Sequence, residues 1–395
     1  MNRTILNAEL ILCGKELTPL EHGSLIIEDG LIRDIIPQRA RNEMNIENMR
    51  EFTFPGQTLM PGMIECHNHL CIDAALPEHL ELLADSSECQ LTLIALKGLR
   101  ADLMSGVTTA RCMGDKYYID ITLKKAIERG QAEGPSLLAA GIGMKGSHGA
   151  GYIGSPHSGP EEIRHTCRQN LSKGADLLKL FVTPGVPDPC SDFVPSFLSL
   201  EEISMAVSEG ARMGVPTAAH CIGGQGLKDC IKGGVSVIEH MYMATEEDVQ
   251  RLAASDCVVD LTSGIFLDPS REEFLSPASA LKVRLNRSRV RDNVARIIRA
   301  RIPFVLGTDA YHGFLYREAG YAVELGAEIV DALKGVTSRA ANVCGLGHRT
   351  GSLSAGMDAD IITVAGNPLA DLSCLAHVGF VMKKGTVCRQ DHAGI

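Results

Sequence analysis

Residues 60–70 read Met60-Pro61-Gly62-Met63-Ile64-Glu65-Cys66-His67-Asn68-His69-Leu70, an apolar run that follows a Pro-Gly turn and carries two histidines. Residues i and i+2 of a β-strand point to the same face, so the side chains of His67 and His69 aim at one spot. Imidazole is the commonest protein ligand for zinc-like metals, and two on one strand fix two corners of a coordination sphere. Such a pair can also be structural, so a metal site requires further ligands from the rest of the chain.

The chain on either side of this run alternates short apolar strands with helical patterns, which is typical of βα units in a parallel sheet. Eight strands are expected, at residues 63–67, 107–112, 136–141, 177–182, 215–221, 236–241, 257–262 and 303–308. Helices are expected between them, at residues 91–104, 119–128, 161–173, 200–212 and 283–300. This pattern predicts an α/β fold, a (β/α)₈ TIM-like barrel whose catalytic groups lie at the C-terminal strand ends.

Both ends of the chain read as short β-strands without helices between them. Strands are expected at residues 4–13, 24–28, 31–36, 378–383 and 386–388, and residues 351–364 read as a turn followed by a strand. Asp29-Gly30 and Lys384-Gly385 are hairpin-turn signals between neighbouring strands. We therefore expect residues 1–58 and 350–395 to form one small composite β-sandwich domain beside a barrel of residues 59–349.

Composition limits the function classes. The formal net charge of −10 argues against non-specific nucleic-acid binding, which needs a basic surface. The 13 cysteines are scattered with no CxxC pair, which fits reduced thiols better than a disulfide framework. No run approaches the ~18 apolar residues of a membrane span, and the N-terminus has no signal-peptide pattern. We expect a cytoplasmic protein with neither nucleic-acid nor membrane partners.

One lysine interrupts the apolar strand at residues 177–182. Burying the ammonium group of Lys179 without a partner is expensive, and the usual response is a lowered pKa and a neutral amine. A neutral buried amine can add CO₂ to form a carbamate, an anionic oxygen ligand suited to bridging two metals. The alternative is a lysine at the barrel mouth that pairs with a carboxylate.

Three further residues stand at predicted strand ends. His220, His240 and Asp309 end or directly follow the fifth, sixth and eighth strands. Each alone could be structural, but chance placement would not be expected to choose strand ends repeatedly. The candidate metal ligands are therefore His67, His69, Lys179, His220, His240 and Asp309.

The motifs at these positions resemble the binuclear-metal branch of the amidohydrolase superfamily, in particular prolidase-like (Xaa-Pro dipeptidase and carboxypeptidase) and ochratoxinase-like amidohydrolases. They are Leu178-Lys179-Leu180, Ala219-His220-Cys221, Glu239-His240-Met241 and Gly307-Thr308-Asp309-Ala310. The resemblance covers essentially the whole chain. It implies a homo-oligomer with two divalent metal ions, for which zinc suits the nitrogen-rich ligand set.

The resemblance also implies a role for each ligand. One metal would take His67, His69 and Asp309, the other would take His220 and His240, and a carbamate on Lys179 and a hydroxide would bridge them. Asp309 would act as general base and then general acid.

Two residues are secondary candidates. His148, after the third strand, resembles a family histidine that polarises the substrate carbonyl, and the alternative is a solvent-exposed loop histidine. Tyr242 is a candidate for binding a substrate carboxylate or the tetrahedral intermediate, and the alternative is a packing role.

The function expected from this resemblance is metal-dependent hydrolysis of an amide bond in a small molecule or short peptide, such as a dipeptide or N-acyl amino acid. A cyclic-amide hydrolase of the imidazolonepropionase or hydantoinase type is an alternative, although the former is typically mononuclear and Lys179 disfavours it. A deaminase would carry glutamate three residues after the strand-five histidine, where this chain has Gly223. A catalytically silent metal-binding barrel is an alternative from another class.

Overall fold

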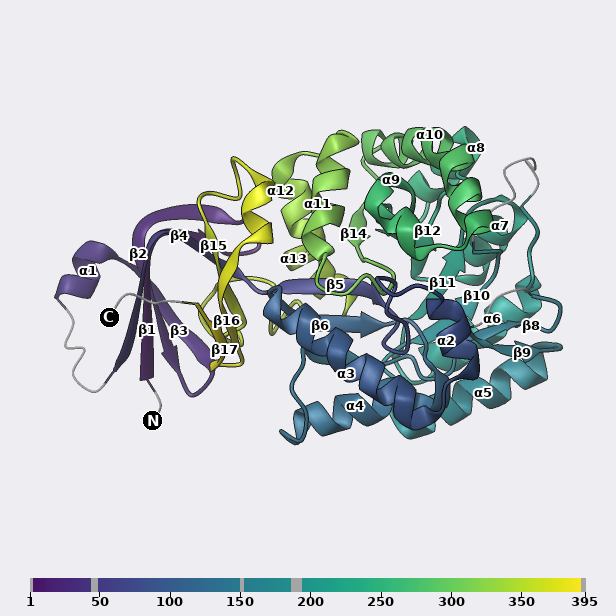
Figure 1. Cartoon of the computed structure of the whole chain (residues 1–395), viewed down its shortest axis with the longest axis horizontal. Coiled ribbons are helices and arrows are strands. Elements are labelled where there is room, and N and C mark those ends of the chain that lie inside the picture. The colour runs from purple at the N-terminus through teal and green to yellow at the C-terminus, as the bar shows by residue number, and fades with distance from the viewer. Residues whose placement is uncertain (1–2, 44–48, 150–152, 186–193, 392–395) are drawn as a thin grey trace.

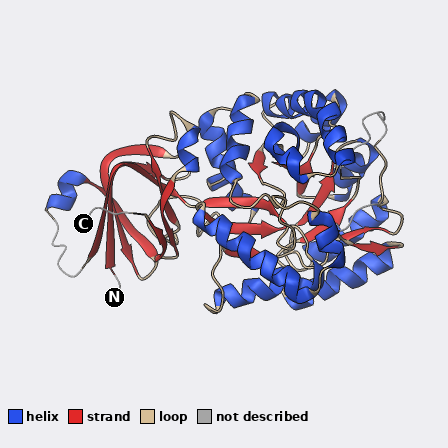
Figure 2. Ribbon diagram, viewed as in Figure 1, coloured by secondary structure: helices blue, strands red, loops and turns tan. Residues whose placement is uncertain are grey.

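A computed structural model describes residues 3–43, 49–149, 153–185 and 194–391 of the chain. It is a mixed α/β structure in which strands from both ends of the chain form a separate sheet at one side of a larger barrel (Figure 1). In the larger part, helices surround the strands (Figure 2). The predicted fold class is confirmed. No helix in these residues combines the length and the apolar character needed to cross a bilayer.

All eight predicted barrel strands are present. They are β5 (Met63–Asn68), β6 (Val107–Cys112), β7 (Ser136–Leu138), β10 (Leu178–Phe181), β11 (Thr217–Cys221), β12 (Val237–His240), β13 (Val258–Leu261) and β14 (Phe304–Leu306). Two further strands follow β7 in the third βα unit. They are β8 (Met144–Gly146), which pairs in parallel with β10, and β9 (Ser155–His157), which pairs in parallel with β8. After β14, the backbone N–H of Asp309 donates to the carbonyl oxygen of His67 at 2.9 Å. This bond ties the last barrel strand to the first.

Helices follow the strands as the pattern predicts. The barrel helices are α2 (His79–Asp85), α3 (Glu88–Met104), α4 (Ile119–Glu128), α5 (Pro160–Lys173), α6 (Leu200–Ala211), α7 (Gly224–Gly233), α8 (Glu246–Ala253), α9 (Gly264–Leu267), α10 (Pro277–Arg299), α11 (Leu315–Glu324), α12 (Ile329–Gly335) and α13 (Ser338–Val343). The described residues also form the 3₁₀ helices η1 (Lys116–Tyr118), η2 (Pro269–Phe274) and η3 (Leu372–Ala376). The first turn of α6 is closed by a capping box between Ser199 and Glu202. Helix α10 begins six residues before its predicted start because Ser276 caps it and Pro277 occupies its first turn.

The remaining strands form one seven-stranded sheet in the order β17-β16-β15-β4-β1-β2-β3. Their bounds are β1 (Arg3–Cys13), β2 (Thr18–Glu28), β3 (Leu31–Pro37), β4 (Arg50–Pro61), β15 (Ile361–Ala365), β16 (Val378–Lys383) and β17 (Thr386–Gln390), with the short helix α1 (Gln38–Asn42) after β3. Strand β4 pairs with β1 and with β15, so it joins the two ends of the chain. The domain boundaries at residues 58 and 350 stay a prediction.

Two predicted turns and an aromatic cluster hold this sheet. Asp29-Gly30 and Lys384-Gly385 have φ values of 49°, 85°, 47° and 76°, the left-handed backbone of a type I′ hairpin turn. The rings of Phe52, Phe54 and Phe380 pack with centroid distances of 5.0 to 6.3 Å. Because β4 ends at Pro61 and β5 begins at Met63, the sheet leads directly into the first barrel strand.

A buried carboxylate connects three parts of the barrel. Asp102 of α3 accepts hydrogen bonds from Asn68 Nδ2, His312 Nδ1 and the Gly313 backbone N–H, each at 2.8 Å. The other ring nitrogen of His312 lies 2.9 Å from the Ile72 carbonyl oxygen. Burial alone would lower the pKa of His312, but the charge and hydrogen bond of Asp102 outweigh it and raise this pKa to about 9.

We expect this pair to make stability pH-dependent. Since the folded pKa exceeds the unfolded value of 6.5, the contribution is fully present below pH 6.5 and is lost as pH rises through about 9, with a magnitude of roughly 3 kcal/mol. His312→Asn keeps a donor near the Nδ1 position but cannot be charged. Thermal unfolding should show that the melting-temperature gap between wild type and variant is largest below pH 6.5 and shrinks toward pH 9. A gap independent of pH would contradict the charged state of His312.

Candidate active site

The six predicted metal ligands lie at one end of the barrel, on or directly after β5, β10, β11, β12 and β14. The Nε2 atoms of His67 and His69 lie 3.6 and 3.7 Å from Asp309 Oδ1. These three residues can present ligand atoms within 4.8 Å of one another, which is a geometry that one metal ion can bridge. The Asp309 side chain is 35% exposed whereas the two imidazoles are buried, so the carboxylate also reaches the adjoining cavity.

The remaining two histidines continue this cluster. The His240 ring centroid lies 4.6 Å from that of His67 and 4.4 Å from that of His220. His67 and His69 are 5.3 Å apart by the same measure. The four imidazoles therefore form one continuous row across the barrel end.

The tautomer of His67 is fixed by Glu239. His67 Nδ1 lies 2.7 Å from Glu239 Oε2, and an ionised carboxylate can only accept, so Nδ1 carries the proton. His67 Nε2 is buried and has no hydrogen-bond partner among the residues placed in the structure. A carboxylate behind a histidine is the usual way in which a metal-binding imidazole is oriented.

The other three histidines each use one ring nitrogen in a hydrogen bond, which leaves the second nitrogen available as a metal ligand. The contacts are His69 Nδ1 with the Gly114 carbonyl (2.7 Å), His240 Nδ1 with Thr262 Oγ1 (2.7 Å) and His220 Nε2 with the Pro184 carbonyl (2.9 Å). Burial lowers the pKa of all four imidazoles, to about 3 for His69 and about 4 for His220. They are therefore neutral near pH 7, as metal ligands must be.

Lys179 is fully buried, and its Nζ has no hydrogen-bond partner in the described part of the chain. Its Nζ lies 5.1 Å from the centre of the Phe181 ring. Burial lowers the pKa of Lys179 to about 8, although the charges of Glu239 and Asp309 oppose this shift. The sequence-based alternative, a lysine paired with a carboxylate, is wrong for the described residues, where Lys179 makes no ion pair.

His67 Nε2 and Lys179 Nζ, which lack hydrogen-bond partners among the described residues, fit a metal centre. Neutral imidazoles, one carboxylate and an unpartnered amine make a donor set suited to zinc or a similar divalent ion. His67, Glu239 and Asp260 also come within 4.8 Å of one another, but Arg111 Nη2 donates to both carboxylates at 3.0 and 2.9 Å. The carboxylates of that second group are therefore already bound by a guanidinium, and the group supports the first.

The backbone is strained where two of these residues leave their strands. His240 and Asp309 have φ values of 78° and 56°, and the residues after them, Met241 and Ala310, have 56° and 66°. Left-handed backbone costs a residue with a side chain about 1–2 kcal/mol and is concentrated at functional sites. The strain turns both side chains toward the row of imidazoles.

The two secondary candidates differ in position. His148, just after β8, is exposed and packs edge-on against Phe197 at 5.7 Å, and it does not line the cavity beside Asp309. Tyr242 is buried and lines that cavity, but its hydroxyl donates to the Thr262 carbonyl oxygen at 2.9 Å. A role for either in substrate binding stays a prediction.

The cavity beside Asp309 has a volume of about 250 Å³ and joins the metal-ligand candidates to an apolar wall. His69, His220, His240 and Asp309 lie on one side, and residues such as Phe181, Ile265, Phe266, Leu275 and Val283 line the rest. Arg271 adds a buried guanidinium that the sequence analysis missed, because it lies in a charged segment that resembles a solvated surface turn. The roles of Glu239 and Arg111 were also not predicted from the sequence. Each is a charged residue inside an apolar strand, which is the same signal that identified Lys179.

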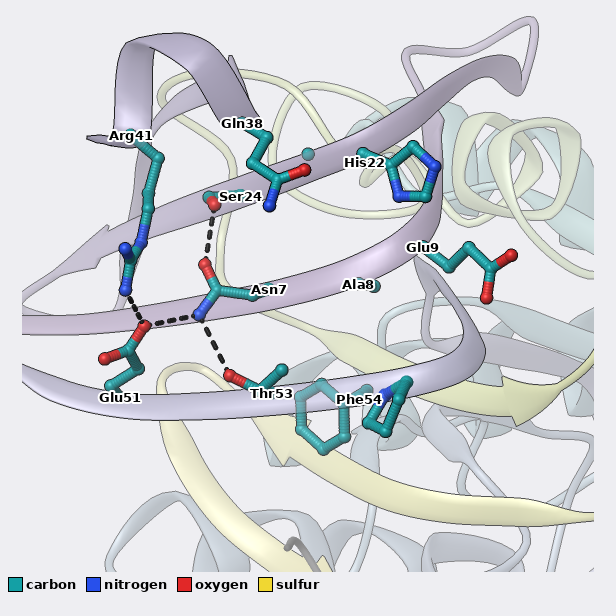
Figure 3. Close-up of a pocket in the computed structure, with 12 residues that line it drawn as sticks. Asn7, Ala8, Glu9, His22, Ser24, Gln38, Arg41, Glu51, Thr53 and Phe54 are labelled. Atoms are coloured by element: carbon teal, nitrogen blue, oxygen red, sulfur yellow. Dashed lines mark hydrogen bonds and ion pairs between the residues drawn. The ribbon is translucent and has the colours of Figure 1, made fainter. Parts of the chain in front are cut away.

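A larger cavity, of about 420 Å³, lies on the terminal sheet (Figure 3). Several of its polar groups already satisfy one another. Asn7 donates to Glu51 at 2.7 Å and accepts from Ser24 at 2.6 Å, while Arg41 pairs with the same Glu51 carboxylate. Nothing in this arrangement calls for a ligand.

Comparisons with known proteins agree with this geometry. The amidohydrolase family model matches residues 58–388. Ochratoxinase of Aspergillus niger is 28% identical, over 93% of this chain and 82% of that protein. Imidazolonepropionase of Aeromonas salmonicida is 24% identical, over 96% of each chain. The crystal structure of a Xaa-Pro dipeptidase with bound methionine shares the fold, with a TM-score of 0.87 at 24% identity over 98% of this chain and 100% of that one. The family resemblance read from the sequence is confirmed.

Gly307 permits the close approach of strands one and eight at this site. A Cβ atom added there would lie 2.4 Å from the Cβ and 2.5 Å from the backbone nitrogen of His67. We expect Gly307→Ala to lower stability by about 1–3 kcal/mol and to weaken zinc binding at least tenfold, because His67 must shift. Thermal unfolding and a competition titration with a zinc chelator measure both effects. Gly320→Ala in α11 is the matched control, since nothing lies within 4 Å of its added Cβ. Equal behaviour of the two variants would contradict this account.

Proposed function

This chain belongs to the amidohydrolase family, and from that premise we propose that it is a two-metal hydrolase that cleaves the amide C–N bond of a dipeptide or an N-acyl amino acid. The observation that carries the proposal is the convergence of four neutral imidazoles, Asp309 and an unpartnered lysine amine beside one small cavity. His67, His69 and Asp309 would hold one ion, and His220 and His240 would hold the second. A carbamate on Lys179 would be shared between the ions.

The metal ions, when bound, would supply a nucleophilic water at neutral pH and polarise the scissile carbonyl. Asp309 is the residue that reaches both the imidazoles and the cavity. Its carboxylate would accept the proton of the attacking water as the new C–O bond forms. It would then donate that proton to the leaving nitrogen as the C–N bond breaks, so one residue serves as base and then acid.

Other residues hold the reacting groups in place. Glu239 keeps the Nε2 lone pair of His67 turned toward the site, and Arg111 keeps Glu239 ionised by contributing a buried positive charge. The Glu239 pKa falls well below its usual range because Arg111 and His67 outweigh the effect of burial. The apolar cavity wall would exclude water and select an apolar substrate side chain.

The similarity to ochratoxinase, at 28% identity, supports hydrolysis of an amide bond. The similarity to imidazolonepropionase over 96% of the chain favours a cyclic amide as the second candidate substrate. Zinc is our proposed metal because nitrogen ligands predominate. A cytoplasmic location is supported by the free thiols of the described cysteines, and a homo-oligomer is proposed by family analogy.

A substrate screen tests the function. Protein reconstituted with zinc should hydrolyse members of a panel of apolar dipeptides and N-acetyl amino acids, and a chelator should abolish the activity. Asp309→Asn should lower kcat about 10²- to 10⁴-fold, since it removes the proton carrier. Amine release is followed by ninhydrin or mass spectrometry, with hydantoin and imidazolone substrates in parallel. Turnover of ring amides alone would favour the cyclic-amide alternative, and ammonia release from aminated rings would favour a deaminase.

The modification of Lys179 can be tested separately. Native mass spectrometry of gently handled protein should show a labile CO₂ adduct that is lost on acidification and is absent from Lys179→Ala. The same variant should lose most activity and bind fewer than two zinc ions per chain. An unmodified mass together with full activity of Lys179→Ala would exclude the carbamate.

A further inference from the structure

A buried arginine lines the cavity beside the proposed proton carrier. Arg271 lies in η2, the 3₁₀ helix that follows strand seven and α9, and is only 2% exposed. Its side chain borders the same cavity as Asp309 and His220. None of the roles assigned above uses this guanidinium.

The guanidinium is held in a fixed orientation. Arg271 Nη1 donates to the carbonyl oxygen of Thr308 at 3.2 Å, and its Cζ lies 4.6 Å from the centre of the Tyr311 ring. A stacked and hydrogen-bonded arginine has already lost most of its side-chain freedom, so it can bind a ligand with little further entropic cost. Thr308 directly precedes Asp309, which sets the cation beside the proposed proton carrier.

This cation makes no ion pair within the part of the chain that the structure describes. Among the described residues, its buried Nε has no hydrogen-bond partner and no carboxylate comes within 4.0 Å of its nitrogen atoms. Neighbouring arginines are different, since Arg317 pairs with Asp268 and Arg287 pairs with Glu272. An unpaired buried charge is costly and is usually compensated by a partner.

The nearby acid Glu318 does not fill this role. Its Oε1 accepts the backbone N–H of Gly264 at 2.8 Å, and its Oε2 is buried without a partner. Burial raises the pKa of Glu318 to about 8, against the opposing charge of Arg271. The carboxyl is therefore largely protonated at neutral pH, which leaves the positive charge of Arg271 available to a ligand.

We propose that Arg271 binds a free carboxylate of the substrate and thereby determines its class. The planar fork of a guanidinium matches a carboxylate through two parallel N–H···O bonds. Because Arg271 adjoins Asp309, which protonates the leaving nitrogen, the carboxylate belongs to the amine side of the scissile bond. The substrate is then an N-acyl α-amino acid or a peptide with its free C-terminal residue as the leaving group, and the apolar wall around Ile265, Phe266 and Leu275 accepts its side chain. This inference rests on the proposed amide hydrolysis.

The test compares substrates that differ only in the carboxylate. N-acetyl-L-phenylalanine and N-acetylphenethylamine share the acyl group, the scissile bond and the aromatic side chain, but only the first carries a carboxylate. With zinc-reconstituted enzyme we expect kcat/KM to be at least about 100-fold higher for the first. Arg271→Met should remove that preference, because kcat/KM for N-acetyl-L-phenylalanine should fall to about the level of N-acetylphenethylamine. Arg271→Lys, which keeps the charge but not the fork, should restore only part of the preference.

A matched control and a binding measurement complete the design. Arg317→Met removes a neighbouring arginine that already has its own carboxylate partner, and it should leave the substrate preference unchanged. N-acetyl-L-phenylalanine should raise the melting temperature of wild type and of Arg317→Met but not of folded Arg271→Met, whether or not it is turned over.

Equal hydrolysis of both compounds by wild type would overturn the inference and leave the proposed function intact. Hydrolysis of neither, with a stabilisation that depends on Arg271, would support the carboxylate site and count against the proposed activity. A stabilisation that survives in Arg271→Met would refute the carboxylate site.

Discussion

The guanidinium of Arg111, buried inside the barrel, donates to Glu239 and Asp260 at 3.0 and 2.9 Å and to the Cys66 carbonyl oxygen at 2.7 Å. These contacts join four strands, since Arg111, Cys66, Glu239 and Asp260 come from β6, β5, β12 and β13. A buried ionic network of this kind contributes little net stability, because removing charges from water offsets most of their attraction. It does penalise any arrangement in which one partner is lost. The result is a fixed placement of Glu239, which in turn fixes His67.

A second constraint acts on the opposite side of His67. Gly307 leaves no room for a side chain against His67, and the Asp309 backbone donates to the His67 carbonyl oxygen. The first and last barrel strands are thus held together at the point where both present candidate ligands. The left-handed backbone at Asp309 is energetically unfavourable, and these surrounding contacts offset its cost. Asp102 also holds this region in place, because its carboxylate accepts hydrogen bonds from Asn68 and His312.

Different parts of the fold supply the candidate metal ligands and the residues that would select a substrate. The ligand candidates come from strands or their ends, whereas Arg271 and part of the apolar wall, including Ile265, Leu275 and Val283, come from η2, α9, α10 and the segments between them. Barrel enzymes vary such segments without disturbing the strands, which is how one metal centre serves many substrates. In this chain, the segments around η2, α9 and α10 contribute part of a small apolar cavity wall and one buried cation, Arg271.

The sequence by itself determined the eight barrel strands, the terminal sheet and the six candidate ligands, because strand periodicity and charges at strand ends are local signals. Lys179 was recognisable from its apolar neighbours alone. Only the tertiary structure decided that Lys179 lacks a carboxylate partner, that Glu239 orients His67, that His148 lies away from the cavity and that Arg271 enters it. The physical reason is that hydrogen bonding and burial in a closed barrel depend on pairs of residues up to hundreds of positions apart. Glu239 and His67 are separated by 172 positions, and nothing local to either specifies the 2.7 Å contact between them.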